Sequence, residues 1–151
     1  MKNKKNILFI MADQLRWDYL SCYGHPTLKT PNIDKLASKG TLFNSAYVQS
    51  PVCGPSRASI YTGRTVFSHG STWNQVPLPI GEYTVGDYLR PYGVKCAVVG
   101  KTHMKPDLTG MKRLGISKKE NIGLIISEPG FDPYERDDGL HPKEVLKKRI
   151  K

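Results

Sequence analysis

The residues with the clearest capacity for chemistry are Cys53 and Arg57, at the two ends of the run C-G-P-S-R. Pro55 suits the first turn of a helix, because its missing N–H is not needed there, and Gly63 suits the position just after a helix end. The pattern therefore predicts a thiol held immediately before a helix start. The helix N-terminus and the Arg57 guanidinium would both attract an anion beside that thiol. The alternative is a buried free cysteine beside a surface arginine.

Further polar side chains follow two apolar runs, Asn6–Ala12 and Val94–Gly100, which are typical of strands buried in a parallel sheet. Asp13 follows the first run, and Lys101 and His103 follow the second. Because open α/β sheets bind ligands at the carboxyl ends of their strands, we expect these side chains at one rim. Asp13 is then a metal ligand or the cap of a turn. Lys101 and His103 point to one side of an extended segment, or are solvated surface residues.

These runs predict an α/β fold, with a predominantly parallel sheet flanked by helices. The remaining expectations concern smaller elements. They are a helix at 31–39 between Thr30 and Gly40, a strand at 41–48, a loop at 65–78, a short helix at 84–90, a strand or short buried segment at 122–126, a turn-rich loop at 128–142 and a weak amphipathic helix or frayed end at 145–150.

The composition limits the classes of function. The net charge is +10, but basic side chains near the two ends supply most of it, and the interior excess of about +3 fits a site for anionic substrates. No recognition-helix pattern or zinc-finger spacing is present, so a nucleic-acid-binding module is the weaker reading. The apolar run at 7–12 is shorter than a signal-peptide core, and no run reaches the length of a membrane span. We therefore expect a cytoplasmic protein without nucleic-acid or membrane partners.

The twelve residues C-G-P-S-R-A-S-I-Y-T-G-R at 53–64 resemble the signature of the formylglycine-dependent sulfatases, which belong to the alkaline phosphatase superfamily. The resemblance extends upstream to Asn6 and downstream through G-K-x-H at 100–103 to Met104, about two thirds of the chain. It implies an alkaline-phosphatase-like fold that is incomplete here. Residues 1–110 would form the amino-terminal part of the catalytic domain, and residues 111–151 a continuation with a basic tail.

In that family the motif cysteine is oxidised to an aldehyde, formylglycine. The resemblance thus implies that a formylglycine-generating enzyme converts Cys53, whose hydrated aldehyde is the nucleophile. Arg57 would stabilise that nucleophile, Lys101 would offset charge on the transferring group, and His103 would be the base of a second step. Asn74 would contact the anionic group of the substrate, or else would bond its own loop backbone.

The resemblance also implies one divalent metal, held by Asp13, Gln14 and the converted Cys53. Sulfatases usually have two adjacent acids where this chain has Asp13-Gln14. An amide oxygen still coordinates a hard cation, although it contributes one negative charge fewer. Calcium is the favoured metal, and manganese or magnesium are alternatives. The glutamine brings this chain nearer to the choline-sulfatase and phosphonate-monoester-hydrolase branches.

The sequence therefore predicts a sulfuric ester hydrolase that acts on a small anionic ester. Sulfatase chains are much longer and supply further metal ligands, so we expect an amino-terminal portion with little or no activity by itself. One alternative is a phosphonate or phosphate ester hydrolase that uses the same aldehyde. Another is a non-catalytic remnant that binds an anion or a partner.

Overall fold

The structure, a computed structural model, describes residues 5–136. It divides into two compact units, Met1–Tyr47 and Val48–Lys151, and each is described by itself. Among the described residues, no helix is both long enough and apolar enough to cross a membrane. The expected helix or frayed end at 145–150 and the last part of the expected loop at 128–142 lie outside the described residues.

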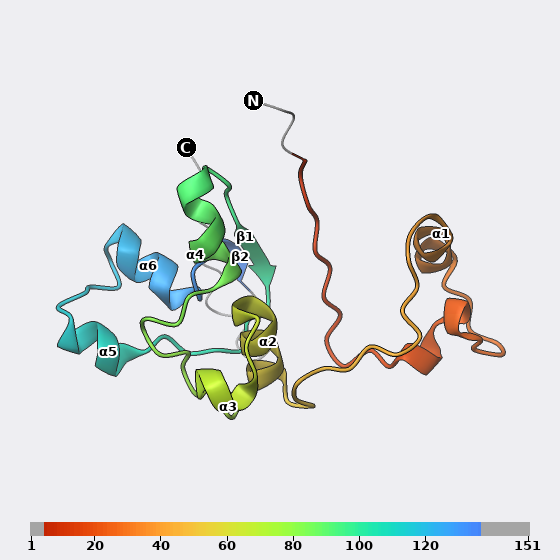
Figure 1. Ribbon diagram of the computed structural model, residues 1–151, viewed down its shortest axis with the longest axis horizontal. Coiled ribbons are helices and arrows are strands. Elements are labelled where there is room, and N and C mark those ends of the chain that lie inside the picture. The colour runs from red at the N-terminus through yellow and green to blue at the C-terminus, as the bar shows by residue number, and fades with distance from the viewer. Residues whose placement is uncertain (1–4, 137–151) are drawn as a thin grey trace. The chain divides into compact units, whose positions relative to one another are not determined.

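The first unit is organised around helix α1 (Pro31–Lys39), which follows two 3₁₀ turns, Trp17–Tyr19 and Ser21–Tyr23 (Figure 1). The helix starts at a proline and ends before Gly40, which confirms the prediction from the sequence. A polar cluster fixes its first turn. The Ser21 hydroxyl accepts the backbone N–H of Thr30 at 2.8 Å and donates to Asp34 Oδ2 at 2.6 Å.

Two strands expected in this unit are absent from the described chain. Residues 6–12 and 41–48 have no regular secondary structure, and Ile7 and Leu8 are 90% and 84% exposed. A strand is stabilised by hydrogen bonds to a neighbouring strand and by burial of its faces. An apolar run indicates what a segment would bury, but it does not supply the partner, so both strand predictions are wrong for this structure.

The second unit consists of short helices around one pair of strands. α2 contacts α3 and α4, and α6 contacts β2. The elements are α2 (Cys53–Thr62), α3 (Val66–His69), α4 (Val85–Leu89), a 3₁₀ turn (Arg90–Tyr92), β1 (Ala97–Gly100), α5 (Leu108–Arg113), α6 (Asn121–Ser127) and β2 (Asp132–Arg136).

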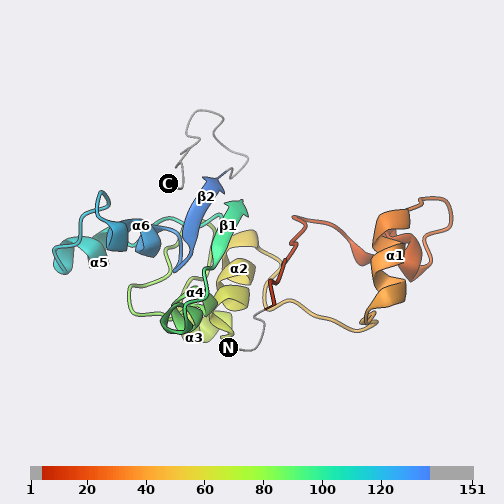
Figure 2. The same ribbon diagram turned by 90° about the horizontal axis from the view of Figure 1, so that it is seen from above.

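β1 and β2 lie side by side as parallel strands (Figure 2), with Ala97 opposite Asp132 and an irregular register between Val98 and Val99. β1 was expected but is shorter than the apolar run, and β2 falls where a loop was expected. The segment at 122–126 is helical, so its reading as a strand is wrong. α3 and α5 were not expected, since short helices carry little periodic signal.

The core of this unit lies against α2. Ala58 and Tyr61 of that helix are buried together with Met104, Met111 and Phe131. The Tyr61 and Phe131 rings meet edge to face, with their centroids 5.0 Å apart. α2 is therefore held by packing along its length, which fixes the position of its first residue, Cys53.

Candidate functional site

Cys53 is the first residue of α2 and is partly exposed. The helix thus begins at the thiol itself, rather than just after it as the sequence suggested. At the other end, Gly63 adopts a φ of 67° and its N–H bonds to the Ser59 carbonyl, as expected of a C-terminal glycine. The thiol therefore lies in the first helical turn, where the helix dipole favours negative charge.

Lys101 and Arg57 both lie beside this turn. Lys101 Nζ is 4.0 Å from Cys53 Sγ, within reach of a weak N–H···S hydrogen bond. Arg57 is buried, with 6% of the residue exposed, and its Nη1 donates to the backbone carbonyl of Lys101 at 2.6 Å. Arg57 thus ties α2 to the end of β1, and this contact brings the ammonium and the thiol together. The structure thus links three of the residues that the sequence singled out, Cys53, Arg57 and Lys101.

Asn74 and His103 meet the same turn at Gly54. The Gly54 N–H donates to Asn74 Oδ1 at 2.8 Å. A β-carbon at position 54 would lie 3.1 Å from that oxygen and 3.3 Å from the His103 carbonyl oxygen. His103 itself has a φ of 56°, a left-handed conformation that histidine adopts more readily than most residues. The backbone at the end of β1 therefore turns sharply as it passes the cysteine.

Asp13 and Gln14 belong to the first unit, and Gln14 has a φ of 58°. Their predicted position beside Lys101 stays a prediction, because the two units are described separately. Within residues 5–136, no three His, Cys, Asp or Glu side chains come together as a metal site. The expected metal centre of Asp13, Gln14 and Cys53 stays a prediction, because its members belong to both units.

A buried histidine that the sequence did not single out supports α2 from the side. His69 is 1% exposed, and its Nε2 lies 2.9 Å from the Ser59 hydroxyl of α2. Its Nδ1 accepts the Ser71 N–H at 3.1 Å, so the neutral tautomer with the proton on Nε2 satisfies both contacts. Burial lowers the pKa of His69, and the charges of Glu82 and Arg64 act on it in opposite directions. No local pattern marks this role, because Ser59 and His69 meet only in the fold.

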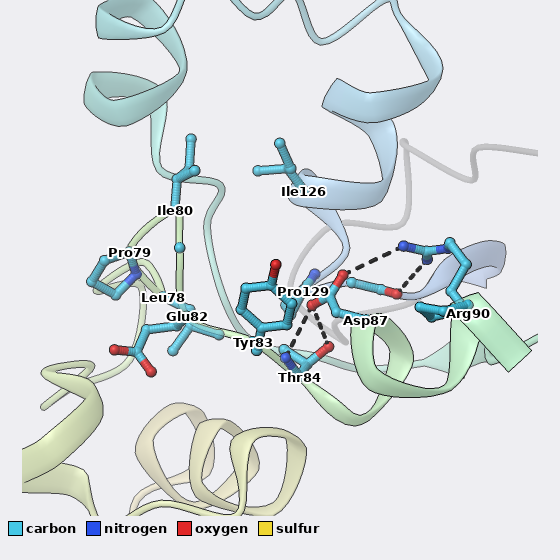
Figure 3. A pocket seen from close by; sticks show the side chains of 13 residues that line it. Leu78, Pro79, Ile80, Glu82, Tyr83, Thr84, Asp87, Arg90, Ile126 and Pro129 are labelled. Atoms are coloured by element: carbon cyan, nitrogen blue, oxygen red, sulfur yellow. Dashed lines mark hydrogen bonds and ion pairs between the residues drawn. The ribbon is translucent and has the colours of Figure 1, made fainter.

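The second unit also contains a cavity of about 410 Å³, lined by the loop at 78–84, the α4 side chains and the end of α6 (Figure 3). On one side, Asp87 accepts hydrogen bonds from the N–H and hydroxyl of Thr84, and Arg90 Nη2 donates to the Gly130 carbonyl at 2.7 Å. Cys53 and Lys101 do not line this cavity. This cavity is thus separate from the thiol site.

Comparison with known proteins identifies the family. The family model of sulfatases matches residues 5–132. Arylsulfatase D of Homo sapiens is 40% identical over 111 residues, which cover 66% of this chain and 19% of that protein. The crystal structure of phosphonate monoester hydrolase of Agrobacterium radiobacter has a TM-score of 0.68 and 31% identity, covering 83% of this chain and 24% of that chain. A structure in complex with its substrate D-glucosamine-2-N,6-O-disulfate has a TM-score of 0.55 and 35% identity, covering 57% and 17% respectively.

The likeness to these structures supports an α/β fold of the alkaline-phosphatase-like class. Since the family model spans most of the sequence, the chain belongs to the sulfatase family. It spans only about a fifth to a quarter of the length of the relatives it matches. A larger parallel sheet stays a prediction, because the described residues contain one pair of strands. The expected division at residue 110 likewise stays a prediction.

Proposed function

We propose that this chain forms the nucleophile-bearing part of a sulfuric ester hydrolase whose substrate is a small anionic ester. The observation that carries the proposal is the convergence of Lys101 and the α2 N-terminus on Cys53, with Nζ 4.0 Å from Sγ, inside the C-G-P-S-R segment. Both groups are positive, and the family membership adds the chemistry. The relative solved with a sulfated glucosamine supports a small anionic substrate.

The cysteine is the proposed nucleophile after conversion to formylglycine by a formylglycine-generating enzyme. The hydrated aldehyde supplies a hydroxyl that attacks sulfur, while the ester S–O bond breaks and the alcohol departs. Lys101 lies where its ammonium can offset negative charge on the nucleophile and on the transferring group. His103, two residues further on, is the proposed base, since a neutral imidazole nitrogen can accept a proton.

Arg57 has two proposed roles. Its contact with the Lys101 carbonyl positions the lysine, and the same guanidinium, one helical turn from Cys53, can stabilise an oxyanion there. A guanidinium carries five N–H donors, so it can contact more than one acceptor at a time. A lysine at position 57 would keep the positive charge but lose the planar fork of donors. We therefore expect that Arg57→Lys does not restore either role.

Asp13 and Gln14 remain the proposed oxygen ligands of a divalent cation, with calcium favoured. Since no three His, Cys, Asp or Glu side chains form a metal site within residues 5–136, we derive no step through the metal. For the same reason we expect the isolated 151-residue chain to release little or no sulfate. Calorimetric titration with Ca²⁺, compared between the natural chain and Asp13→Asn, tests the ligand assignment. Identical titrations would contradict it.

Mass spectrometry of trypsin-digested protein, produced together with a formylglycine-generating enzyme, tests the central proposal. The expected peptide covers residues 40–57 and should carry oxygen in place of the Cys53 sulfur and react with an aldehyde probe. The peptide of residues 96–101, which contains Cys96, is the internal control and should keep its thiol. An unmodified Cys53 under these conditions would favour the non-catalytic remnant instead.

A phosphonate or phosphate ester hydrolase is the second candidate. The specific observations in its favour are Gln14 and the structural likeness to a phosphonate monoester hydrolase. Competition assays with a converted chain should separate the two. Stronger protection of the aldehyde from its probe by inorganic sulfate than by methylphosphonate would favour the sulfatase, and the reverse order would favour the rival. Cys53→Ala is the control and should show no probe reaction.

A further inference from the structure

The side chain at the N-cap of α2 offers no hydrogen-bond acceptor to the first turn of the helix. The N-cap residue is Val52, whose apolar side chain cannot accept a hydrogen bond from the turn. Helices normally use a Ser, Thr, Asp or Asn side chain at this position to satisfy one of the unbonded N–H groups. The helix that carries the proposed nucleophile therefore lacks the usual local cap.

Two N–H groups at the start of this helix nevertheless have side-chain acceptors. The Val52 N–H donates to the Ser50 hydroxyl at 3.1 Å, and Pro55 has no N–H to satisfy. The Gly54 N–H, at the second helical position, donates to Asn74 Oδ1 at 2.8 Å. The acceptor that would stand at the N-cap in an ordinary helix thus comes from a residue 20 positions later in the chain.

We propose that Asn74 is a positioning residue that caps α2 from a distant loop and thereby fixes Cys53 beside Lys101. The geometry at Gly54 supports this role independently. A β-carbon there would lie 3.3 Å from the Asn74 Cα and 3.3 Å from the His103 carbonyl oxygen, so the loop and the end of β1 both close on this residue. Glycine at position 54 permits the approach that the cap requires.

The same loop also braces α2 further along its length. It follows directly after His69, the last residue of α3, which contacts Ser59, and within it the Ser71 hydroxyl donates to the Val76 carbonyl at 2.9 Å. One loop thus holds the first turn and the middle of the helix at the same time. This distinguishes Asn74 from a residue whose main role is to bond its own backbone. Its amide nitrogen remains the group that would donate to a substrate anion, which is a separate role.

The test is made on the full 151-residue chain with its cysteine unconverted, so it does not depend on the proposed chemistry. Hydrogen exchange of the Gly54 amide is measured by NMR in the natural chain, in Asn74→Ala and in Asn74→Asp. We expect exchange to be about five- to tenfold faster in Asn74→Ala, as for loss of a helix cap. Asn74→Asp, which keeps an acceptor oxygen, should stay within about twofold of the natural chain. Asn121→Ala, an exposed asparagine at the start of α6, is the control and should not change Gly54.

Asn74→Asp also provides a second measurement, the pH dependence of the Gly54 amide shift, which can be made even if Asn74→Ala does not fold. If the introduced carboxylate accepts the Gly54 N–H, the Gly54 amide shift must follow its titration between about pH 3 and 6. A Gly54 amide shift that stays constant over this pH range would overturn the proposal. Equal exchange of Gly54 in Asn74→Ala and the natural chain would also overturn it. Failure of aldehyde formation would overturn only the proposed function, so the two results are distinguishable.

Discussion

The two units of this chain contain helices that are stabilised in different ways. In the first unit, no described residue is buried, and α1 rests on its proline start and on the polar cluster of Ser21, Thr30 and Asp34. In the second unit, six of the ten residues of α2 are buried, although its start has no local cap. α1 is thus stabilised mainly by residues at and near its own start, and α2 mainly by the segments that pack against it.

This contrast bears on the position of the proposed chemistry. A catalytic side chain has to be held to within a fraction of an ångström, and packing together with contacts from other segments provides that restraint. α2 has a core on one side, the loop at 69–76 on another and the end of β1 at its first turn. The following substitutions test the contrast, from the largest expected effect to the smallest. Each is followed through urea denaturation by amide NMR signals of α1 and α2, which report on the two units separately.

Phe131→Ala should be the most damaging change. It removes a buried ring that meets Tyr61 of α2 edge to face, and leaves a cavity beside the helix. We expect a loss of about 3 kcal/mol in the free energy of unfolding of the second unit. The α1 signals should keep their urea midpoint. A matching shift of the α1 midpoint would show that the two units unfold together.

Acidification should weaken the second unit through His69. Burial lowers the pKa of this histidine, so the unfolded chain takes up a proton near pH 6.5 and the folded chain only at lower pH. Protonation thus favours unfolding, and stability that is complete above about pH 6.5 should fall by about 1.4 kcal/mol per pH unit until the folded pKa is reached.

The measurement compares the urea midpoint of α2 at pH 7.5 and pH 5.5. His69→Gln should remove most of this difference at a lower overall stability, because its amide can still donate to Ser59 but cannot be protonated. His25→Gln in the first unit is the control and should leave the difference intact. If His69→Gln kept the full pH dependence, another group would be its source.

Ser21→Ala should weaken α1 by about 1 kcal/mol, because it removes the hydroxyl that accepts the Thr30 N–H and donates to Asp34. The amide exchange rates of α1 should rise, and those of α2 should not change. Ser38→Ala is the control in the same helix, since its hydroxyl makes one exposed contact to the Lys35 carbonyl. Equal effects of the two substitutions would argue against a special role for the cluster.

Leu36→Ala should have the smallest effect, within about 0.5 kcal/mol, because the side chain is 70% exposed and alanine is a good helix former. Leu36 lies with Ile33 and Ala37 on one apolar face of this helix. A loss above 1 kcal/mol in the stability of α1 would show that this face is covered by another part of the chain.

The helices that could be predicted are those whose ends are marked by particular residues. α1 has Pro31 and Gly40, and α2 has Pro55 and Gly63, so their existence followed from local stereochemistry. The strand predictions fared worse, since 6–12 is exposed and β2 falls in an expected loop. A strand requires a partner, and no single run of residues specifies that partner.

The site was predictable in part for the same reason. The types and spacing of Cys53, Arg57 and Lys101 indicated an anion site, and the structure brings these three side chains together. Their proposed catalytic roles, and the place of Asp13 and Gln14 beside them, remain predictions. His69 could not be found in advance, because its partners are far away in the sequence and it carries no motif.

The sequence by itself determined the family, the nucleophile candidate and the ends of two helices, because these depend on residue identity and on contacts within a few positions. Only the tertiary structure decided what holds the nucleophile in place. Lys101 lies 48 positions from Cys53, and the cap of α2 is 20 positions from Gly54. Such contacts form when packing has already brought the segments together, and packing depends on the whole chain.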